Sequence, residues 1–164
     1  MIVVSDTSPL IVLAKLHMLD HLRTMFGSVL IPLEVREELA AKGEVQGAPD
    51  VLSQCGEWMV VKTPGTLLEL TGLDAGEIAA ISLALDVKAG FLMIDERDGR
   101  KIAQSLGLQI IGVVGLLESF ARRGLVSLAE AFQELKNTNF RFPASQLDSR
   151  LEEFNRRRNS TSTS

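Results

Sequence analysis

The segment from Phe91 to Arg100 constrains the fold of this chain more than any other stretch. Its first four residues, Phe91 to Ile94, are apolar, Asp95 follows them, and a polar run then leads into a helical segment. An uninterrupted apolar run before a helix is typical of a strand that is buried in a parallel sheet. Ligands of open α/β sheets bind outside the carboxyl ends of the strands, so the sequence predicts Asp95 at such a site.

The start of the chain has the same pattern. Residues 2–5 are expected to form a strand, Asp6 follows it, and Ser8 and Pro9 are residues that favour the beginning of a helix. We therefore expect Ser8 to be the N-cap and Pro9 the first helical residue. Asp6 and Asp95 each follow a predicted buried strand, and we expect the two strands to be neighbours in one sheet.

Strands and helices alternate up to about residue 123. Further strands are expected at Val29–Ile31, Trp58–Lys62, Phe91–Ile94 and Gln109–Ile111. Helices are expected at His17–Phe26, Leu33–Ala41, Leu73–Lys88, Arg97–Leu106, Val113–Arg123, Leu128–Lys136 and Ala144–Arg157, with a short one that ends at Gln54. Such an alternation predicts an α/β fold with a parallel sheet and helices on both of its faces.

The 164 residues are enough for one domain with its own hydrophobic core. We expect this domain to span residues 1–137, and residues 138–158 to form a C-terminal extension that packs on the domain or on a dimer partner. The stretch Gly43 to Asp50 is predicted as a loop, and the polar residues 159–164 as a disordered tail.

The sequence contains no segment that indicates a membrane or secreted protein. The longest uncharged apolar run, Pro9 to Ala14, is far too short to span a membrane, and no basic leader precedes the first strand. Cys55 is the only cysteine, which excludes an internal disulfide and fits a reducing compartment. We expect its side chain to be a small buried apolar group in a cytoplasmic protein.

Acidic residues dominate the charge of the chain. The formal net charge of −4 argues against a protein that coats nucleic acid by electrostatic attraction alone. It is compatible with an acidic site that binds cations. The candidates for such a site are Asp6, Glu38, Glu77 and Asp95, with Asp98 as a fifth.

Each of these acids also has an ordinary structural explanation. An acid at the beginning of a helix is stabilising without any catalysis, which would account for Asp98 and for the acids that follow strands. Glu77 stands three residues after Asp74, which is the spacing of a capping box. Glu38 precedes Lys42 by four residues, the spacing of a surface ion pair.

Taken together, however, the acids predict a metal site. Carboxylates that converge on one point repel each other, and divalent cations remove that repulsion. Mg²⁺ and Mn²⁺ prefer such hard oxygen ligands, and two ions can stabilise the attacking and leaving oxygens of a phosphodiester. The sequence contains no evident Ser-His-Asp set, no Gly-x-x-x-x-Gly-Lys loop and no strand followed by Gly-x-Gly-x-x-Gly. Metal-assisted phosphodiester hydrolysis is the reaction class that this inventory favours.

Several short motifs occur in an order that is typical of one protein family. They are Val3 to Leu10, Ile31-Pro32 with Val35 and Glu38-Leu39, Leu73 to Glu77 leading into Ala79 to Ala84, Ile94 to Arg97 with Arg100 and Ala103, Leu106-Gly107, and Ile111 to Leu117. Over roughly residues 1–126 this ordered set resembles the PIN domain, and more narrowly the prokaryotic PIN-like branch related to VapC toxins, DUF3368.

The resemblance implies a three-layer α/β/α sandwich with a central parallel sheet and an acidic pocket that binds Mg²⁺ or Mn²⁺. It also implies endoribonuclease activity on RNA, commonly as the toxin that pairs with a small antitoxin protein, and a homodimer. The catalytic and metal-binding acids would be Asp6, Glu38, Glu77 and Asp95, with Asp98 as an additional metal ligand and Thr7 or Ser8 in a supporting hydrogen bond. Many VapC proteins place an aspartate later in the helix that Glu77 opens here.

Basic residues near these acids are the expected phosphate contacts. Arg97, Arg100 and Lys101 follow Asp95 on one predicted helix, whereas the arginines at 156–158 are interpreted as solvated surface charge. Two alternatives stay open. One is a catalytically weak PIN-like module that binds nucleic acid or protein and uses its acids as helix caps. The other is a haloacid-dehalogenase-like phosphatase, which requires an aspartate where this chain has Ser8.

Overall fold

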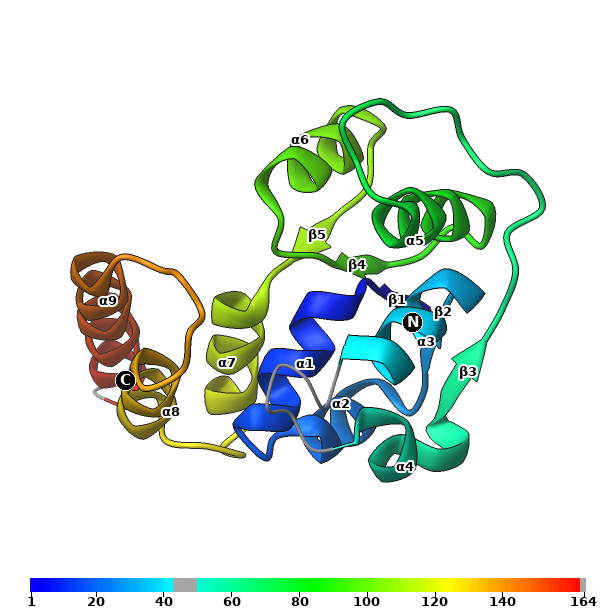
Figure 1. Ribbon diagram of the computed structural model, residues 1–164. Coiled ribbons are helices and arrows are strands. Elements are labelled where there is room, and N and C mark those ends of the chain that lie inside the picture. The colour runs from blue at the N-terminus through cyan, green and yellow to red at the C-terminus, as the bar shows by residue number, and fades with distance from the viewer. Residues whose placement is uncertain (43–49, 163–164) are drawn as a thin grey trace. The chain divides into compact units, whose positions relative to one another are not determined.

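The computed structural model describes residues 1–42 and 50–162 (Figure 1). It divides the chain into two compact units, Met1–Val113 and Val114–Ser164. The sequence had predicted one domain up to residue 137, with an extension after it. Apart from Asp50, the predicted loop Gly43 to Asp50 lies outside the described residues.

The first unit is built on a five-stranded parallel sheet with the strand order β3-β2-β1-β4-β5. Its strands are β1 Val3–Ser5, β2 Val29–Ile31, β3 Met59–Val61, β4 Phe91–Met93 and β5 Ile110–Ile111. All five strands that the apolar runs predicted are present, and most are shorter than expected by one or two terminal residues. The sheet is therefore parallel throughout, as the alternation of strands and helices predicted.

Helices cover both faces of this sheet. Figure 1 shows α5 and α6 on one side and α1 and α2 on the other. The helices of the first unit are α1 Thr7–Lys15, α2 Leu19–Phe26, α3 Leu33–Lys42, α4 Val51–Cys55, α5 Ala75–Asp86 and α6 Arg97–Ser105, with a 3-10 turn, η1, at Gly56–Trp58. The predicted α/β fold is confirmed. Cys55 at the end of α4 is a buried free thiol, and burial raises its pKa to about 12.

The first helix begins two residues before the predicted position. Asp6, not Ser8, is its N-cap residue, with an extended backbone (φ −79°, ψ 173°). Pro9 is the third helical residue rather than the first. A proline is tolerated throughout the first turn, because the N–H groups there have no partner within the helix. The helix therefore starts directly at the end of β1 and leaves no connecting loop.

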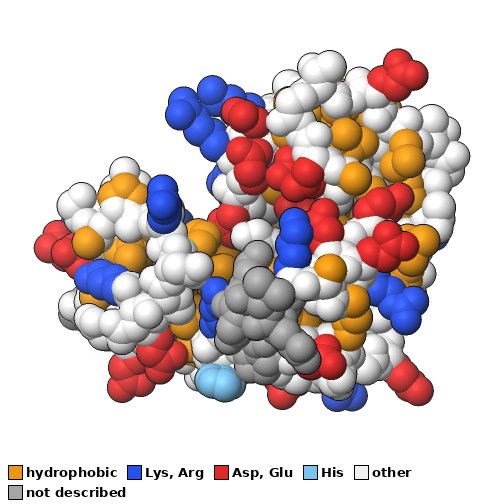
Figure 2. Space-filling view, viewed as in Figure 1, with side chains coloured by type: hydrophobic (Ala, Val, Ile, Leu, Met, Phe, Trp, Pro, Cys, Tyr) orange, Lys and Arg blue, Asp and Glu red, His pale blue; other side chains and the backbone are white. Residues whose placement is uncertain are grey.

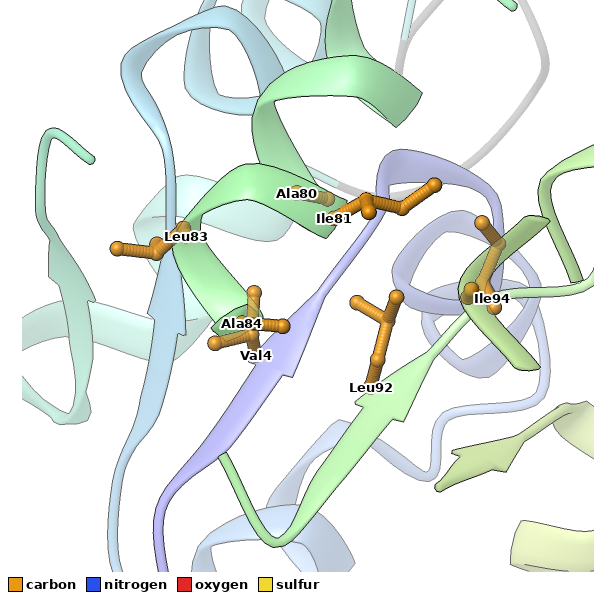
Figure 3. Packing of buried hydrophobic residues seen from close by; sticks show 8 residues of the cluster. Val4, Ala80, Ile81, Leu83, Ala84, Leu92 and Ile94 are labelled. Atoms are coloured by element: carbon orange, nitrogen blue, oxygen red, sulfur yellow. The ribbon is translucent and has the colours of Figure 1, made fainter. Parts of the chain in front are cut away.

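A hydrophobic cluster packs α5 and α6 against β1 and β4. Figure 3 shows Ala80, Ile81 and Ala84 of α5 over Val4 and Leu92, and all of these side chains are fully buried. The small residues of α5 allow the helix to lie close to the strands. This packing fixes the first turn of α5, which carries Glu77, at the carboxyl end of the two central strands.

The second unit consists of helices α7 Val113–Arg122, of which Val113 belongs to the first unit, α8 Leu128–Lys136 and α9 Ala144–Ser162. Ser127 is the N-cap of α8, and Lys136 Nζ lies 3.0 Å from Asp148 Oδ1 of α9. None of the helices described, α9 included, is long and apolar enough to cross a membrane.

The predicted disordered tail is wrong for residues 159–162, because α9 continues through them. The hydroxyls of Ser160, Thr161 and Ser162 donate to backbone carbonyls three or four residues earlier, at distances of 2.7–3.0 Å. Such bonds satisfy the carbonyl groups of the last turn, so hydroxyl residues can continue the helix. Residues 163 and 164 lie outside the described residues.

Candidate active site

The two central strands bring Asp6 and Asp95 to the same edge of the sheet. Strands β1 and β4 pair directly, with Ser5 opposite Met93, and the Asp6 N–H donates to the Met93 carbonyl at 2.9 Å. The chain order of the strands reverses between β1 and β4, which makes this edge the point where ligands bind in doubly wound sheets. The prediction that these strands are neighbours is therefore confirmed.

Asp6 is a buried carboxyl group among other acids. Its side chain belongs to a residue that is only 5% exposed. The pKa of Asp6 is raised from 3.8 to about 7, mainly by burial. The hydrogen bond from the Thr7 backbone lowers it, and the negative charges of Asp74, Glu38 and Asp95 contribute to the rise. Among the charges of the described residues that act on Asp6, none is positive, so its negative charge is left uncompensated.

Glu77 lies in the first turn of α5 and is 8% exposed. Burial raises its pKa to about 8, followed by the charges of Asp74, Asp6 and Glu96. The Asp74 carboxylate accepts the Glu77 N–H at 2.8 Å, which is one half of the predicted capping box. The side chain of Glu77, however, interacts with the surrounding acids, so the cap alone does not account for this residue.

Glu38 reaches the same region from α3. Thr7 Oγ1 donates to Glu38 Oε2 at 2.9 Å, and Lys42 Nζ lies 3.7 Å from the same oxygen. The side chain of Glu38 is 21% exposed. A Cβ atom at Gly76 would collide with the Glu38 carboxylate. Glycine at this position therefore allows the carboxylate to approach the first turn of α5, next to Glu77.

Asp95 is held by backbone and side-chain contacts at the end of β4. The Val113 N–H donates to both of its carboxylate oxygens, at 3.1 and 3.2 Å. Burial raises the pKa of Asp95 to about 6, while the Val113 hydrogen bond and the nearby Arg100 lower it. A side chain at Gly112 would collide with the Asp95 carboxylate and with Arg100 Nη1. The orientation of Asp95 therefore depends on a glycine.

The remaining predicted site residues are more exposed than the buried acids of the site. Asp98 and Ser8 are exposed, and Asp98 is not among the charges that raise the pKa of Asp6, Glu77 or Asp95. Arg97 and Lys101 are exposed on α6, where they can reach a ligand. Arg100 is half-buried and donates to the Ile94 carbonyl at 2.8 Å, so its first role is to hold the backbone before Asp95.

Two acids of this region were not predicted as site residues. Asp74 is the N-cap of α5, and Glu96 is the N-cap of α6, where its carboxylate accepts the Gly99 N–H at 2.7 Å. The spacing of a capping box explained Asp74 in the sequence and nothing there singled out Glu96, so only the fold shows that their charges act on Glu77. Their position within three residues of Glu77 or Asp95 was the available signal. Figure 2 shows acidic side chains gathered around the N-terminal ends of α5 and α6.

The chemistry of these donors fits a divalent cation of the Mg²⁺ type. The region offers carboxylate oxygens, two of its carboxyl groups are strongly desolvated, and their mutual repulsion is uncompensated. Among residues 1–42 and 50–162 there is no group of three or more His, Cys, Asp or Glu side chains placed to hold a metal ion. Mg²⁺ keeps several waters and is commonly held by one or two carboxylates, so such a group is not required.

The fold and the acidic edge of the sheet are typical of one class of protein. Comparison with known families identifies that class. The family model DUF3368, described as PIN domain, matches residues 2–156. The chain therefore belongs to the PIN domain family. PIN domains are generally nucleases and typically use divalent metals. This membership leaves no support for the dehalogenase-like alternative.

A solved structure shows the same fold. It is a PilT N-terminus domain protein from the hyperthermophilic archaeon Sulfolobus solfataricus P2, with a TM-score of 0.50 and 20% sequence identity. The similarity covers 73% of this chain and 92% of that protein. Among the curated proteins, none matches this chain.

Proposed function

We propose that the protein is a divalent-metal-dependent endoribonuclease that uses Mg²⁺ or Mn²⁺. The observation that carries the proposal is the set of buried carboxyl groups at the switch point of the sheet, where the pKa values of Asp6 and Glu77 are raised to about 7 and about 8. A protein that needed these groups only for its fold would gain stability by replacing them, because buried charges without partners are costly.

Asp6 and Glu77 are the two carboxylates that would hold the cation, with Asp95, Glu38 and the supporting Thr7 beside them. When bound, the cation supplies positive charge that activates a water molecule and stabilises the negative charge of the phosphodiester. In hydrolysis, the water oxygen forms a bond to phosphorus while the bond to one ester oxygen breaks, and the leaving oxygen gains a proton. The raised pKa values place protons on these carboxyls near neutral pH, so metal binding releases protons.

Arg97 and Lys101 are proposed to contact the phosphate groups of the substrate. Both are exposed on α6, the helix that follows Asp95, and neither pairs with a carboxylate among the described residues. Arg100 belongs to the support of Asp95, because its guanidinium donates to the Ile94 carbonyl and lies near the carboxylate.

The test is cleavage of a labelled RNA by the purified chain with and without Mn²⁺. Wild-type protein is expected to cleave only with the metal. Asp95→Asn is expected to lose at least about 100-fold in rate, because the charge at the site is reduced. Asparagine keeps an oxygen that can accept the Val113 N–H, so the fold is expected to survive. Unchanged cleavage by the folded variant would contradict the proposal.

A second function, a PIN-like module that binds nucleic acid or protein without cleavage, has one observation in its favour. The described part of the chain holds no cluster of three metal-ligating side chains. A module of this kind would use Asp74 and Glu96 as helix caps only. It would show no thermal stabilisation by Mn²⁺, whereas the nuclease should show stabilisation that Asp6→Asn removes.

We further propose that the protein acts as the toxin of a toxin–antitoxin pair and forms a homodimer. The support for this role is its membership of the PIN domain family and its resemblance to the VapC-related branch. Expression of the wild-type chain is expected to stop cell growth, and Asp95→Asn is expected to relieve the arrest. Sedimentation of the purified protein measures the oligomeric state, and a monomer at micromolar concentration would contradict the dimer.

A further inference from the structure

The second unit contains a groove that the proposed chemistry does not use. The groove is open, has a volume of about 1050 Å³, and is lined by the end of α7, the turn before α8 and one face of α9. Four arginines line it, Arg122, Arg150, Arg157 and Arg158. We call this feature the arginine groove. All of its lining residues belong to the second unit.

Two of the four arginines carry charge that no acid neutralises. Arg150 pairs with Glu118, and Arg157 Nε lies 2.9 Å from Glu153 Oε1. Arg122 donates to the hydroxyl of Ser119 at 2.9 Å, and in the described part of the chain neither Arg122 nor Arg158 pairs with a carboxylate. The groove therefore carries an excess positive charge.

These arginines contribute little to the stability of the fold. The side chain of Arg157 is 81% exposed, and an exposed ion pair four residues apart on a helix is weak. A structural role does not explain why the excess charge faces one groove. Arginine is the residue that binds phosphate with two parallel hydrogen bonds, which makes an anion the natural ligand.

The distribution of charge along the chain supports an anionic ligand in this unit. Residues 1–113 carry nine Lys and Arg against fifteen Asp and Glu, whereas residues 114–164 carry eight against six. The acidic first unit by itself repels a polyanion, since RNA binding depends on phosphate neutralisation by basic residues. A nuclease with this charge distribution needs a separate basic surface to hold its substrate.

The other side chains of the groove suit RNA better than an acidic peptide. Phe154 lines it together with the hydroxyl residues Ser127 and Ser149. Aromatic rings and guanidinium groups stack on unpaired bases, and hydroxyls can hydrogen-bond to ribose and phosphate oxygens. An acidic peptide would use the arginines and would have no base to place against the ring.

We infer that the arginine groove binds the sugar-phosphate backbone of single-stranded RNA, with a base stacked on Phe154. The inference rests on the proposed ribonuclease function, because RNA is the substrate that the function requires. It assigns substrate binding to residues of the second unit, in addition to Arg97 and Lys101 of the first.

The experiment measures the affinity of the full chain for a labelled single-stranded RNA of about twelve nucleotides, a length within the range of single-strand sites. Binding is measured by fluorescence anisotropy without divalent metal, so that cleavage does not interfere. The test variant is Arg122→Gln with Arg158→Gln. The control is Arg123→Gln with Arg156→Gln. It removes the same amount of charge from positions that do not line the groove and that lie one or two residues from Arg122 and Arg158.

The expected effects follow from counterion release. Each lost contact reduces the steepness of the plot of log affinity against log salt by about 0.7 for a single strand. The slope of the test variant should therefore be shallower than that of the wild type by about 1.4. This slope corresponds to roughly tenfold weaker binding than wild type at about 200 mM salt. At about 50 mM salt the loss of affinity should be about seven times larger still. The control should change affinity less than about threefold, because it keeps the groove arginines.

Phe154→Leu separates stacking from electrostatic attraction. This variant is expected to lose about fivefold or more in affinity for the RNA and little for an abasic strand of the same length. Equal losses for both strands would mean that Phe154 only supports the fold, and would overturn the stacking part of the inference.

Equal affinity of the test variant and the control overturns the inference. If the groove pair instead removes binding of poly-glutamate and leaves RNA binding intact, the groove belongs to an acidic protein partner and the inference is also wrong. The cleavage assay is separate: metal-dependent cleavage that Asp95→Asn abolishes supports the proposed function whatever the groove does. RNA binding through the groove without any cleavage supports the inference and contradicts the nuclease.

Discussion

Replacing Asp6 with asparagine tests whether the buried acids cost stability in the metal-free protein. The pKa of Asp6 rises from 3.8 to about 7, mainly because the carboxyl group is buried. A tenfold change in proton affinity is about 1.4 kcal/mol, so the ionised carboxylate costs up to roughly 4 kcal/mol above pH 7. Asparagine has nearly the same shape and no charge. Part of the gain is lost because its amide also needs hydrogen-bond partners.

We expect Asp6→Asn to raise the free energy of unfolding by about 1–3 kcal/mol at about pH 8, which is a rise of roughly 3–9 °C in melting temperature. The pH dependence follows from the direction of the pKa change. The folded protein holds a proton on Asp6 that the unfolded chain releases near pH 4, so wild-type stability falls as the pH rises towards 7. The variant should therefore gain nothing at about pH 4 and most above pH 7.

The assay is thermal or denaturant unfolding of both proteins from about pH 4 to pH 8, in the presence of a chelator. Asp20→Asn is the control, because Asp20 is exposed in the first turn of α2. Addition of Mn²⁺ at about 100 times its dissociation constant should stabilise wild type by about 2.7 kcal/mol, and the Asp6 variant much less. A variant that is destabilised equally at both ends of the pH range would refute the reasoning.

Further substitutions test the support of the site and the core. Gly112→Ala should displace the Asp95 carboxylate, lower stability by about 1–3 kcal/mol and reduce cleavage at least about tenfold, and unchanged cleavage rates would contradict this. Thr7→Val removes the hydrogen bond to Glu38 and should cost about 1 kcal/mol in denaturant unfolding, where no loss is the contrary result. Leu92→Ala should cost about 2–5 kcal/mol by calorimetry, because this side chain is fully buried between α5 and the sheet.

The local pattern of the sequence determined most of the secondary structure. Apolar runs predicted every strand of the sheet, and the capping-box spacing of Asp74 and Glu77 indicated where α5 begins, since capping depends on residues a few positions apart. The errors lie at element ends. Asp6 rather than Ser8 caps the first helix, and α9 continues past residue 158. Hydrogen bonds of the helix ends decide these limits, and several residue types can make them.

The candidate site was predictable only in part. Strand-end position marked Asp6 and Asp95, because carboxyl ends of parallel strands share one edge. The sequence also predicted that β1 and β4 are neighbours, although they are nearly ninety residues apart in the chain. Only the tertiary structure gave their register, with Ser5 opposite Met93, and brought Asp74 and Glu96 close enough to act on Glu77. The sequence by itself determined which residues are acids and which segments are strands. Long-range packing decided which acids are desolvated by burial. It therefore also decided which of them repel each other strongly enough to attract a cation.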